Sequence, residues 1–122
     1  MNVVFVGATK GMGRALARQL AGRGDRLFLL GRDGDKLAKS AADLGVHRGR
    51  RPPAYALCDL EHPETFAPAF DAAIADLGTL DAVVVTAGMF ADHVALEDDA
   101  ALALRLLSVN FSHTVLLCEE AK

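Results

Sequence analysis

Three glycines near the amino terminus have the spacing of a phosphate-binding turn. Gly7, Gly11 and Gly13 follow an apolar run at residues 3–6 and precede a helix-like segment. In such a unit the first glycine permits the tight turn, the second lets the backbone approach phosphates, and the third lets helix and strand pack closely. The helix N-terminus adds unpaired N–H groups and a partial positive charge. The pattern predicts a dinucleotide pyrophosphate site, although the same residues would suit a plain turn before an ordinary helix.

Two cations lie where they could decide which dinucleotide is bound. Lys10 is inside the glycine turn, and Arg32 follows the apolar segment 26–30. A guanidinium at that position can donate to a 2′-phosphate in bidentate fashion, whereas a cofactor without this phosphate favours an acid that accepts from the ribose hydroxyl. We therefore predict NADP(H) in preference to NAD(H). Asp33 could instead pair with Arg32 or contact the ribose itself, and both cations could be solvated surface groups.

Small and polar residues follow the next two apolar segments, where they could contact the rest of a dinucleotide. Asp59, after residues 54–57, could accept a hydrogen bond from an adenine amino group or could cap the following helix. Ala87 and Gly88, after residues 80–85, are small enough for a ribose to approach the backbone. These positions extend the predicted site along the ends of the apolar segments.

Groups that could catalyse a reaction are few. Asn110 stands inside a predicted helix, where asparagine is unfavourable on propensity alone, so its amide could hydrogen-bond into the site or could simply be exposed. The four histidines lie on separate segments without ligand spacing, so we predict no metal site. The single tyrosine, Tyr55, is expected to be packed in its apolar segment. No other constellation supplies a general acid or base.

The composition limits the partners. The 122 residues suffice for one domain, which we place at 1–122. A net charge of −3 gives no overall attraction to nucleic acid or to an anionic membrane, and the basic segment 47–51 is interpreted as a solvated loop. We find no run of about 18 apolar residues and no secretory leader. Cys58 and Cys118 are predicted to be buried free thiols, which indicates a reducing, cytoplasmic location.

Apolar segments alternate with helix-like segments, which predicts an α/β fold with a parallel sheet. The predicted strands are residues 3–6, 26–30, 54–57 and 80–85. The predicted helices are residues 14–20, 35–44, 63–77 and 98–120. We expect the strand order 3-2-1-4, which places the glycine turn at the switch point between the first and fourth strands.

Helical periodicity also predicts the buried faces. In the first helix the apolar face comprises Met12, Ala15, Leu16, Gln19 and Leu20. In the third helix it comprises Phe66, Phe70, Ala73, Ile74 and Leu77. The last helix is apolar around most of its circumference, so we expect it to be covered on more than one side.

These motifs together resemble the short-chain dehydrogenase/reductase family. The matching residues, in chain order, are Gly7-x3-Gly11-x-Gly13, Asp59-Leu60, Ala87-Gly88 and Val109-Asn110. The resemblance covers the whole chain but corresponds to only the N-terminal half of the family's usual domain. It implies a Rossmann-type, three-layer α/β/α fold that binds NAD(P)(H).

The resemblance also implies a role for each matching residue. The adenosine and pyrophosphate would be surrounded by Gly7, Thr9, Lys10, Gly11, Met12 and Gly13. Arg32 would contact the 2′-phosphate, and Asp59 and Leu60 the adenine. Ala87 and Gly88 would contact the nicotinamide-side ribose. Asn110 matches the asparagine of the family's catalytic tetrad, which holds a water in a proton relay.

The chain departs from the family pattern at several positions. Val6 stands where the family usually has threonine, and Val85-Thr86 stands where it has two asparagines whose amides brace the central strand. The family's catalytic serine and its Tyr-x3-Lys pair are absent from these residues, because the residue four positions after Tyr55 is Asp59.

Two functions follow as hypotheses. The chain is either the cofactor-binding portion of a truncated short-chain oxidoreductase, acting on a small carbonyl or alcohol substrate when completed, or a stand-alone NADP(H)-binding or dimerising module without catalysis. An apolar fourth strand left at the sheet edge favours burial against more chain or against a second copy, so we expect a homo-oligomer.

Overall fold

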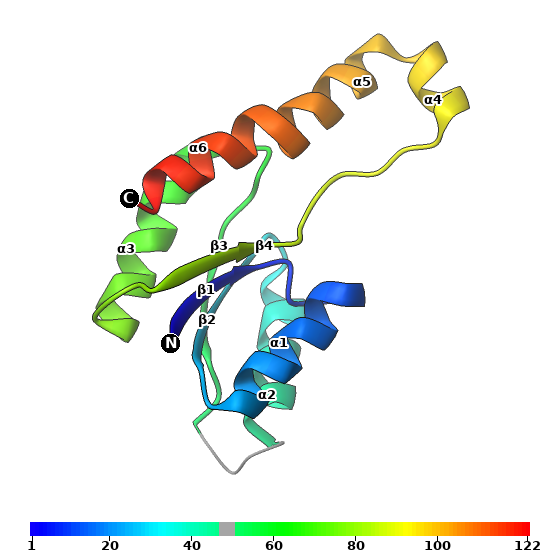
Figure 1. The fold of residues 1–122 in the computed structure, drawn as a ribbon. Coiled ribbons are helices and arrows are strands. Elements are labelled where there is room, and N and C mark those ends of the chain that lie inside the picture. Colours follow the sequence, from blue (N-terminus) through cyan, green and yellow to red (C-terminus); the bar gives the residue numbers. More distant parts are fainter. Residues whose placement is uncertain (47–50) are drawn as a thin grey trace.

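The computed structural model describes residues 1–46 and 51–122 and contains a four-stranded parallel sheet. Its strands are β1 (Asn2–Val6), β2 (Arg26–Gly31), β3 (Ala54–Leu57) and β4 (Ala82–Val85), in the order β3-β2-β1-β4 (Figure 1). This confirms the predicted fold class and strand order. The central strand β1 is almost wholly buried, as expected of a strand with neighbours on both sides and helices on both faces. The basic segment at 47–50 lies outside the described residues.

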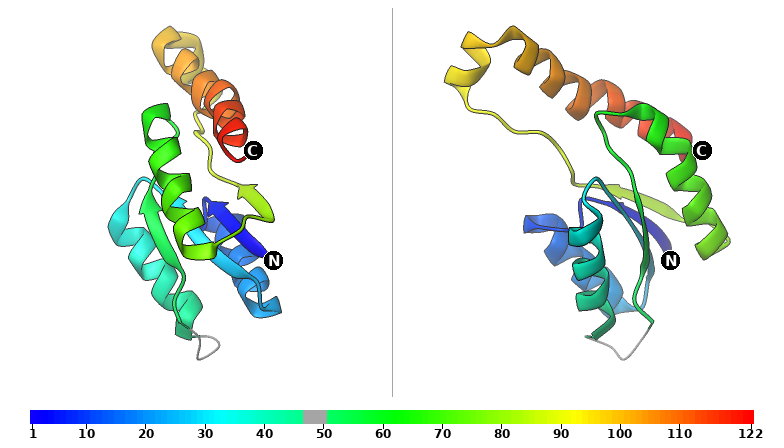
Figure 2. Two further views of the ribbon diagram at one scale, coloured as in Figure 1. Left: turned by 90° about the vertical axis from the view of Figure 1, so that its left-hand side faces the viewer. Right: turned by 180° about the vertical axis from the view of Figure 1, so that it is seen from behind.

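Two helices cover one face of the sheet. They are α1 (Gly11–Arg23) and α2 (Gly34–Val46), which contact each other and lie on the same side of the sheet (Figures 1 and 2). Their apolar side chains pack with Val3 and Phe5 of β1 and with Leu27 and Leu29 of β2. Alternate residues of the two central strands therefore belong to this layer.

The opposite face is covered by helices from the second half of the chain. These are α3 (Phe66–Leu77), preceded by the short 3-10 turn η1 (Pro63–Thr65), and α6 (His113–Glu120). Val4 and Val6 of β1 pack with Phe70 of α3 and Leu117 of α6. The fold is thus a three-layer α/β/α arrangement, with both sheet faces apolar.

A long bent segment joins β4 to α6. It contains α4 (His93–Asp98), α5 (Ala100–Leu107) and the π-helical turn η2 (Ser108–Ser112), after which α6 continues the same helix. Helix α5 begins next to Asp99, whose carboxylate accepts from the N–H of Leu102 at 3.0 Å. Sequence periodicity located this helix within two residues of its start but predicted neither α4 nor the π turn. Figure 1 shows α4 and the start of α5 extending beyond the sheet.

The predicted inner face of α1 is wrong except at Leu20, which is partly buried against the core. Its buried residues are Gly13 and Ala17, whereas Met12 is 87% exposed and Leu16 is 36% exposed. Small residues face the sheet because the helix axis lies very close to β1, and the larger side chains are turned outward. The prediction for α3 is wrong at Ile74, which is 42% exposed, and Ala69 is buried in the same helix.

The prediction that the last helix is covered on several sides is also wrong. Only Val109 and Leu117 are buried along Ala100–Glu120, while Leu104 is 66% exposed and Phe111 is 70% exposed. By length and composition this helix could cross a membrane, although the core helix of a soluble protein passes the same test. The expectation of no membrane contact therefore stays a prediction.

Two further residues differ in burial from the sequence prediction. Tyr55 lies on β3, an edge strand, and is 44% exposed, so it is not packed as predicted. Cys58 and Cys118 are both free, but only Cys58 is buried. Burial raises the pKa of the Cys58 thiol, and a hydrogen bond with Thr65 partly opposes this shift.

Candidate functional site

The glycine turn follows β1 and lies next to the end of β4. This is the switch point of the sheet, because the chain adds β2 and β3 on one side of β1 and β4 on the other. Gly7 follows β1 directly and has φ of +110°, a backbone conformation that L side chains rarely adopt. A Cβ at this position would lie 2.4 Å from the Thr86 hydroxyl and 2.5 Å from the Ala87 nitrogen. The turn therefore needs glycine both for its conformation and for the close approach of β4.

The third glycine allows α1 to approach β1, as predicted. A Cβ on Gly13 would lie 2.1 Å from the Gly7 carbonyl oxygen, a distance at which the helix would have to move. Gly11, at the first position of α1, has φ of +59° and open space where a Cβ would project. The backbone at Gly11 is thus accessible from outside, as close approach of a phosphate requires.

The backbone N–H groups in the first turn of α1 donate no hydrogen bond to the side chain of the N-cap residue. Lys10 is the N-cap residue, is extended, and makes no side-chain capping bond. The first-turn N–H groups of the helix therefore point out beside a lysine ammonium and an open glycine backbone. This arrangement suits an anionic group.

Thr86 joins the glycine turn to β4. Its hydroxyl donates to the Gly7 carbonyl oxygen at 3.1 Å, and its backbone N–H donates to the Val6 carbonyl oxygen at 2.8 Å. From the sequence, Thr86 was a small residue after the fourth strand and a departure from two expected asparagines, and its bond to the glycine turn was not predicted. The signal was present, since a hydroxyl directly after a strand can brace a neighbouring turn.

At the end of β2, Arg32 is exposed and Asp33 is engaged elsewhere. The Asp33 carboxylate accepts the N–H groups of Asp35 and Lys36, each at 3.1 Å, and so caps α2. Within the described part of the chain no ion pair joins Arg32 to Asp33 or to another carboxylate. Of the alternatives considered for Asp33, pairing with Arg32 is not observed.

At the end of β3, Asp59 shapes a tight turn. Its Oδ1 accepts the N–H of Glu61 at 2.9 Å, and its own N–H donates to the Thr65 hydroxyl at 3.0 Å. Across residues 1–46 and 51–122, Oδ2 of Asp59 has no hydrogen-bond partner. Leu60 is 6% exposed, so its side chain belongs to the core while its backbone remains in the turn. Asp59 thus closes this local turn and does not cap the helix that follows, and its second oxygen is unpaired among the described residues.

At the end of β4, Asn110 holds the following loop. Its side-chain oxygen accepts the Met89 N–H at 2.6 Å, and its side-chain nitrogen donates to the Met89 carbonyl at 2.7 Å. Gly88 lies beneath this pair, and a Cβ there would be 3.1 Å from the Asn110 oxygen. Of the two alternatives predicted for Asn110, both are partly observed, because the side chain is hydrogen-bonded to this loop and is also exposed. The asparagine lies in the π turn, a rare helical geometry that is common at functional sites.

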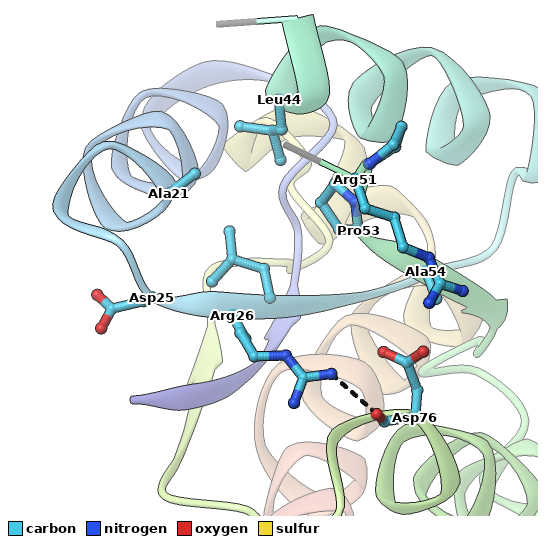
Figure 3. A pocket seen from close by; sticks show the side chains of 10 residues that line it. Ala21, Asp25, Arg26, Leu44, Arg51, Pro53, Ala54 and Asp76 are labelled. Carbon is cyan, nitrogen blue, oxygen red and sulfur yellow. Dashed lines mark hydrogen bonds between the residues drawn. The ribbon is translucent and has the colours of Figure 1, made fainter. Parts of the chain in front are cut away.

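A separate shallow pocket lies at the other end of the sheet. It is lined by Asp25 and Arg26 at the start of β2, by Ala54 of β3 and by neighbouring loop residues (Figure 3). Arg26 points across it and donates to the Asp76 carbonyl oxygen at 3.0 Å. None of the predicted site residues lines this pocket. Among the described residues no group of three or more histidine, cysteine or acidic side chains could hold a metal ion.

The whole chain matches a known family model. The model describes short chain dehydrogenases and matches residues 1–122. Carbonyl reductase family member 4 of Danio rerio is 31% identical over 99% of this chain and 49% of its own length. D-threitol dehydrogenase of Mycolicibacterium smegmatis is 32% identical over 95% of this chain and 44% of its own length. The chain therefore spans about half the length of these relatives.

Solved structures share the fold over nearly the whole chain. A short chain dehydrogenase from Shigella flexneri 2a, determined in complex with NADP, has a TM-score of 0.87 at 25% identity. The match covers 98% of this chain and 52% of that protein. An actinorhodin polyketide ketoreductase with NADPH also has a TM-score of 0.87, covering 98% of this chain and 46% of its own, at 23% identity.

Proposed function

The chain belongs to the short-chain dehydrogenase family, and on that premise we propose that it is the NADP(H)-binding portion of an oxidoreductase acting on a carbonyl or alcohol. The observation that carries the proposal is the glycine turn at the sheet's switch point, where Gly11 is open and the first turn of α1 is uncapped. An anionic pyrophosphate complements these donors. Gly7, Thr9, Met12 and Gly13 complete the turn.

The preference for NADP(H) rests on two cations. Arg32 is exposed after β2 and has no ion-pair partner in the described ranges, while the nearest acid, Asp33, is occupied by capping α2. A guanidinium in this position can bind a 2′-phosphate with two parallel hydrogen bonds. Lys10 adds a second positive charge beside the glycine turn.

The remaining residues are assigned to the two ends of the cofactor. Asp59 would accept from the adenine amino group through its free oxygen, with Leu60 contacting the ring from the backbone side. Ala87 and Gly88 would contact the nicotinamide-side ribose, where side chains are small. Asn110 would fix this loop through Met89 and hold a water for proton transfer.

When bound, the cofactor supplies the hydride, and these residues bind and orient it. The family's catalytic serine and its Tyr-x3-Lys pair, in which the tyrosine is the general acid and base, are absent from the 122 residues. We therefore expect hydride transfer by this chain alone to be undetectable, because the family's general acid and base is missing and no other constellation in the sequence replaces it. We propose a cytoplasmic location and a small carbonyl or alcohol as the substrate of the completed enzyme.

A second candidate is a non-catalytic NADP(H)-binding module that dimerises. The observation that favours it is the exposed apolar surface: β4 is an edge strand, and Leu104, Leu107 and Phe111 of the last helix are each at least 60% exposed. An isologous pairing of two copies would cover this surface without further chain.

Calorimetric titration of the 122-residue protein with NADPH and with NADH tests the cofactor assignment. We expect NADPH to bind about tenfold more tightly or better, as charge-assisted hydrogen bonds to a phosphate predict. Arg32→Glu should abolish the preference, whereas the matched control Lys39→Glu, an exposed charge reversal on α2, should leave it intact. Equal affinity for the two cofactors would refute the role of Arg32. Binding of neither would refute the nucleotide site in this chain.

A further inference from the structure

The last helix contacts the turn after β3 as well as the loop after β4. Nδ1 of His113, the first residue of α6, donates to the Leu60 carbonyl oxygen. A carbonyl oxygen only accepts, so the proton of the ring must be on Nδ1. Two turns earlier in the helix, Arg105 forms an ion pair with Glu61 at 2.8 Å. The turn carrying Asp59 is therefore joined to the helix at two neighbouring residues, Leu60 and Glu61.

The π turn brings these two helix residues onto one face. Arg105 and His113 are eight positions apart, which in a regular α-helix would separate them by about 80° around the axis. A π turn accommodates one extra residue, so eight positions occupy about the two turns that seven normally fill. In this chain the π turn is Ser108–Ser112, between the two residues. It aligns Arg105 and His113 toward the same turn.

The two contacts differ in strength. The Arg105 and Glu61 side chains are 57% and 29% exposed, and an ion pair of that kind contributes little. His113 is half-buried against Leu60, whose side chain is anchored in the core. Its hydrogen bond is shielded from water to a greater degree and is the stronger tether.

We propose that His113 is a positioning residue for the adenosine side of the cofactor site. By holding the Leu60 carbonyl it fixes the backbone on which the free oxygen of Asp59 is presented. The Thr65 hydroxyl donates to the His62 carbonyl oxygen at 2.7 Å, a hydrogen bond within the same turn. It does not connect the turn to α6. His113 supplies that second constraint. The inference rests on the proposed function, since it concerns the same site.

The same helix thereby links the two ends of the site. Asn110 holds the loop on the nicotinamide side, and three residues later His113 holds the turn on the adenosine side. The two contacts are made by adjacent turns of one rigid element. Loss of the His113 contact should therefore weaken binding of the adenosine half without disturbing the Met89 pair.

The test uses adenosine 2′,5′-bisphosphate, which contains the adenosine half and the 2′-phosphate but no nicotinamide. We expect His113→Leu to weaken its binding about 3- to 10-fold, the effect of one lost hydrogen bond. His113→Asn restores a donor near the position of Nδ1 and should recover most of the affinity. The matched control His93→Leu removes an exposed histidine on α4 that pairs with Glu97, and should change nothing. Amide exchange should be faster at Glu61 in His113→Leu and unchanged at Met89.

Each result supports or overturns a distinct claim. If His113→Leu binds the bisphosphate as tightly as the wild type, or if His113→Asn is as weak as His113→Leu, the positioning role is refuted while the nucleotide site stands. If the wild type binds neither the bisphosphate nor NADPH, the proposed function fails and the inference with it. If His113→Leu does not fold, the positioning role is tested by NMR on the wild type. The Nδ1–H resonance of His113 should shift when the bisphosphate is added, and an unchanged resonance would refute the role.

Discussion

The side-chain amide of Asn110 pairs with both backbone polar groups of Met89. The distances are 2.6 Å to the N–H and 2.7 Å to the carbonyl oxygen, across 21 positions of the sequence. The Asn110 side chain therefore makes the two backbone hydrogen bonds that a neighbouring β-strand would make with the loop after β4. This loop would otherwise have unpaired backbone groups at the point where the site requires a fixed geometry.

Replacement of Asn110 tests this pair. Asn110→Ala removes both hydrogen bonds and should lower the free energy of unfolding by about 1 kcal/mol, with much faster amide exchange at Met89. Ser112→Ala, in the same π turn, is the control, because its hydroxyl makes no hydrogen bond with the described residues. Unchanged protection of the Met89 amide in Asn110→Ala would contradict the pairing.

The glycines of the turn should respond differently to alanine. Gly13→Ala places a Cβ 2.1 Å from the Gly7 carbonyl oxygen and should destabilise the fold by about 2–3 kcal/mol. Gly11→Ala has open space and should cost only about 1 kcal/mol for its positive φ. Denaturant unfolding measures both. Gly11→Ala should nevertheless weaken NADPH binding, because its methyl group occupies the side from which a phosphate approaches.

Thr86 should be sensitive to loss of its hydroxyl rather than of its methyl group. Thr86→Val keeps the shape but cannot donate to the Gly7 carbonyl oxygen, so we expect a loss of about 1 kcal/mol in unfolding free energy. Thr86→Ser keeps the donor and should lose less. If the serine variant proves the less stable of the two, packing rather than the hydrogen bond explains this residue.

The exposed apolar face of the last helix predicts self-association. We expect sedimentation velocity to show a concentration-dependent dimer of the wild type, and Phe111→Glu to shift it to monomer, because Phe111 is 70% exposed there. Ala72→Glu, on the outer surface of α3, is the control and should not change the equilibrium. A wild type that is monomeric at every concentration would refute the expected homo-oligomer.

Acid should remove a stabilising contact at the amino end of the sheet. A hydrogen bond from the amino-terminal ammonium at 2.7 Å, and then Arg23, lower the pKa of Asp25 against an opposing desolvation effect. A carboxyl with a lowered pKa in the folded state stabilises above its ordinary pKa, and this contribution is lost as pH falls through the folded value. Unfolding free energy measured from about pH 6 to about pH 3 should fall less steeply in Asp25→Asn than in the wild type.

The sequence predicted the sheet well because strand signals are local. Runs such as Val3-Val4-Phe5-Val6 and Val83-Val84-Val85 are apolar on both faces, and the strand order followed from the alternation of strands and helices, which agreed with the position of the glycine turn. The burial of helix faces was less predictable. In α1 the closeness of the helix to β1 selects Gly13 and Ala17 for the inner face, and hydrophobicity alone would select Met12 and Leu16.

Contacts between residues that are distant in the sequence could not be predicted from the periodicity of apolar residues. The candidate site residues at the strand ends were predicted from their types and stay predictions, but the partners that the structure gives them were not predicted. Thr86 with Gly7, Asn110 with Met89 and His113 with Leu60 are pairs between different elements. The π turn was missed although Asn110 was recognised as unfavourable in a helix, because the propensity of single residues does not distinguish a π turn from an α-helix.

The Thr86–Gly7 bond has a consequence for how the protein is made. The two residues are 79 positions apart, so the glycine turn, although it leaves the ribosome among the first residues, acquires its final geometry only after β4 has been synthesised. Until then β1 can pair with β2 alone, and the edge of β1 that later pairs with β4 has no neighbouring strand. The glycine turn is thus translated early but reaches its final conformation late.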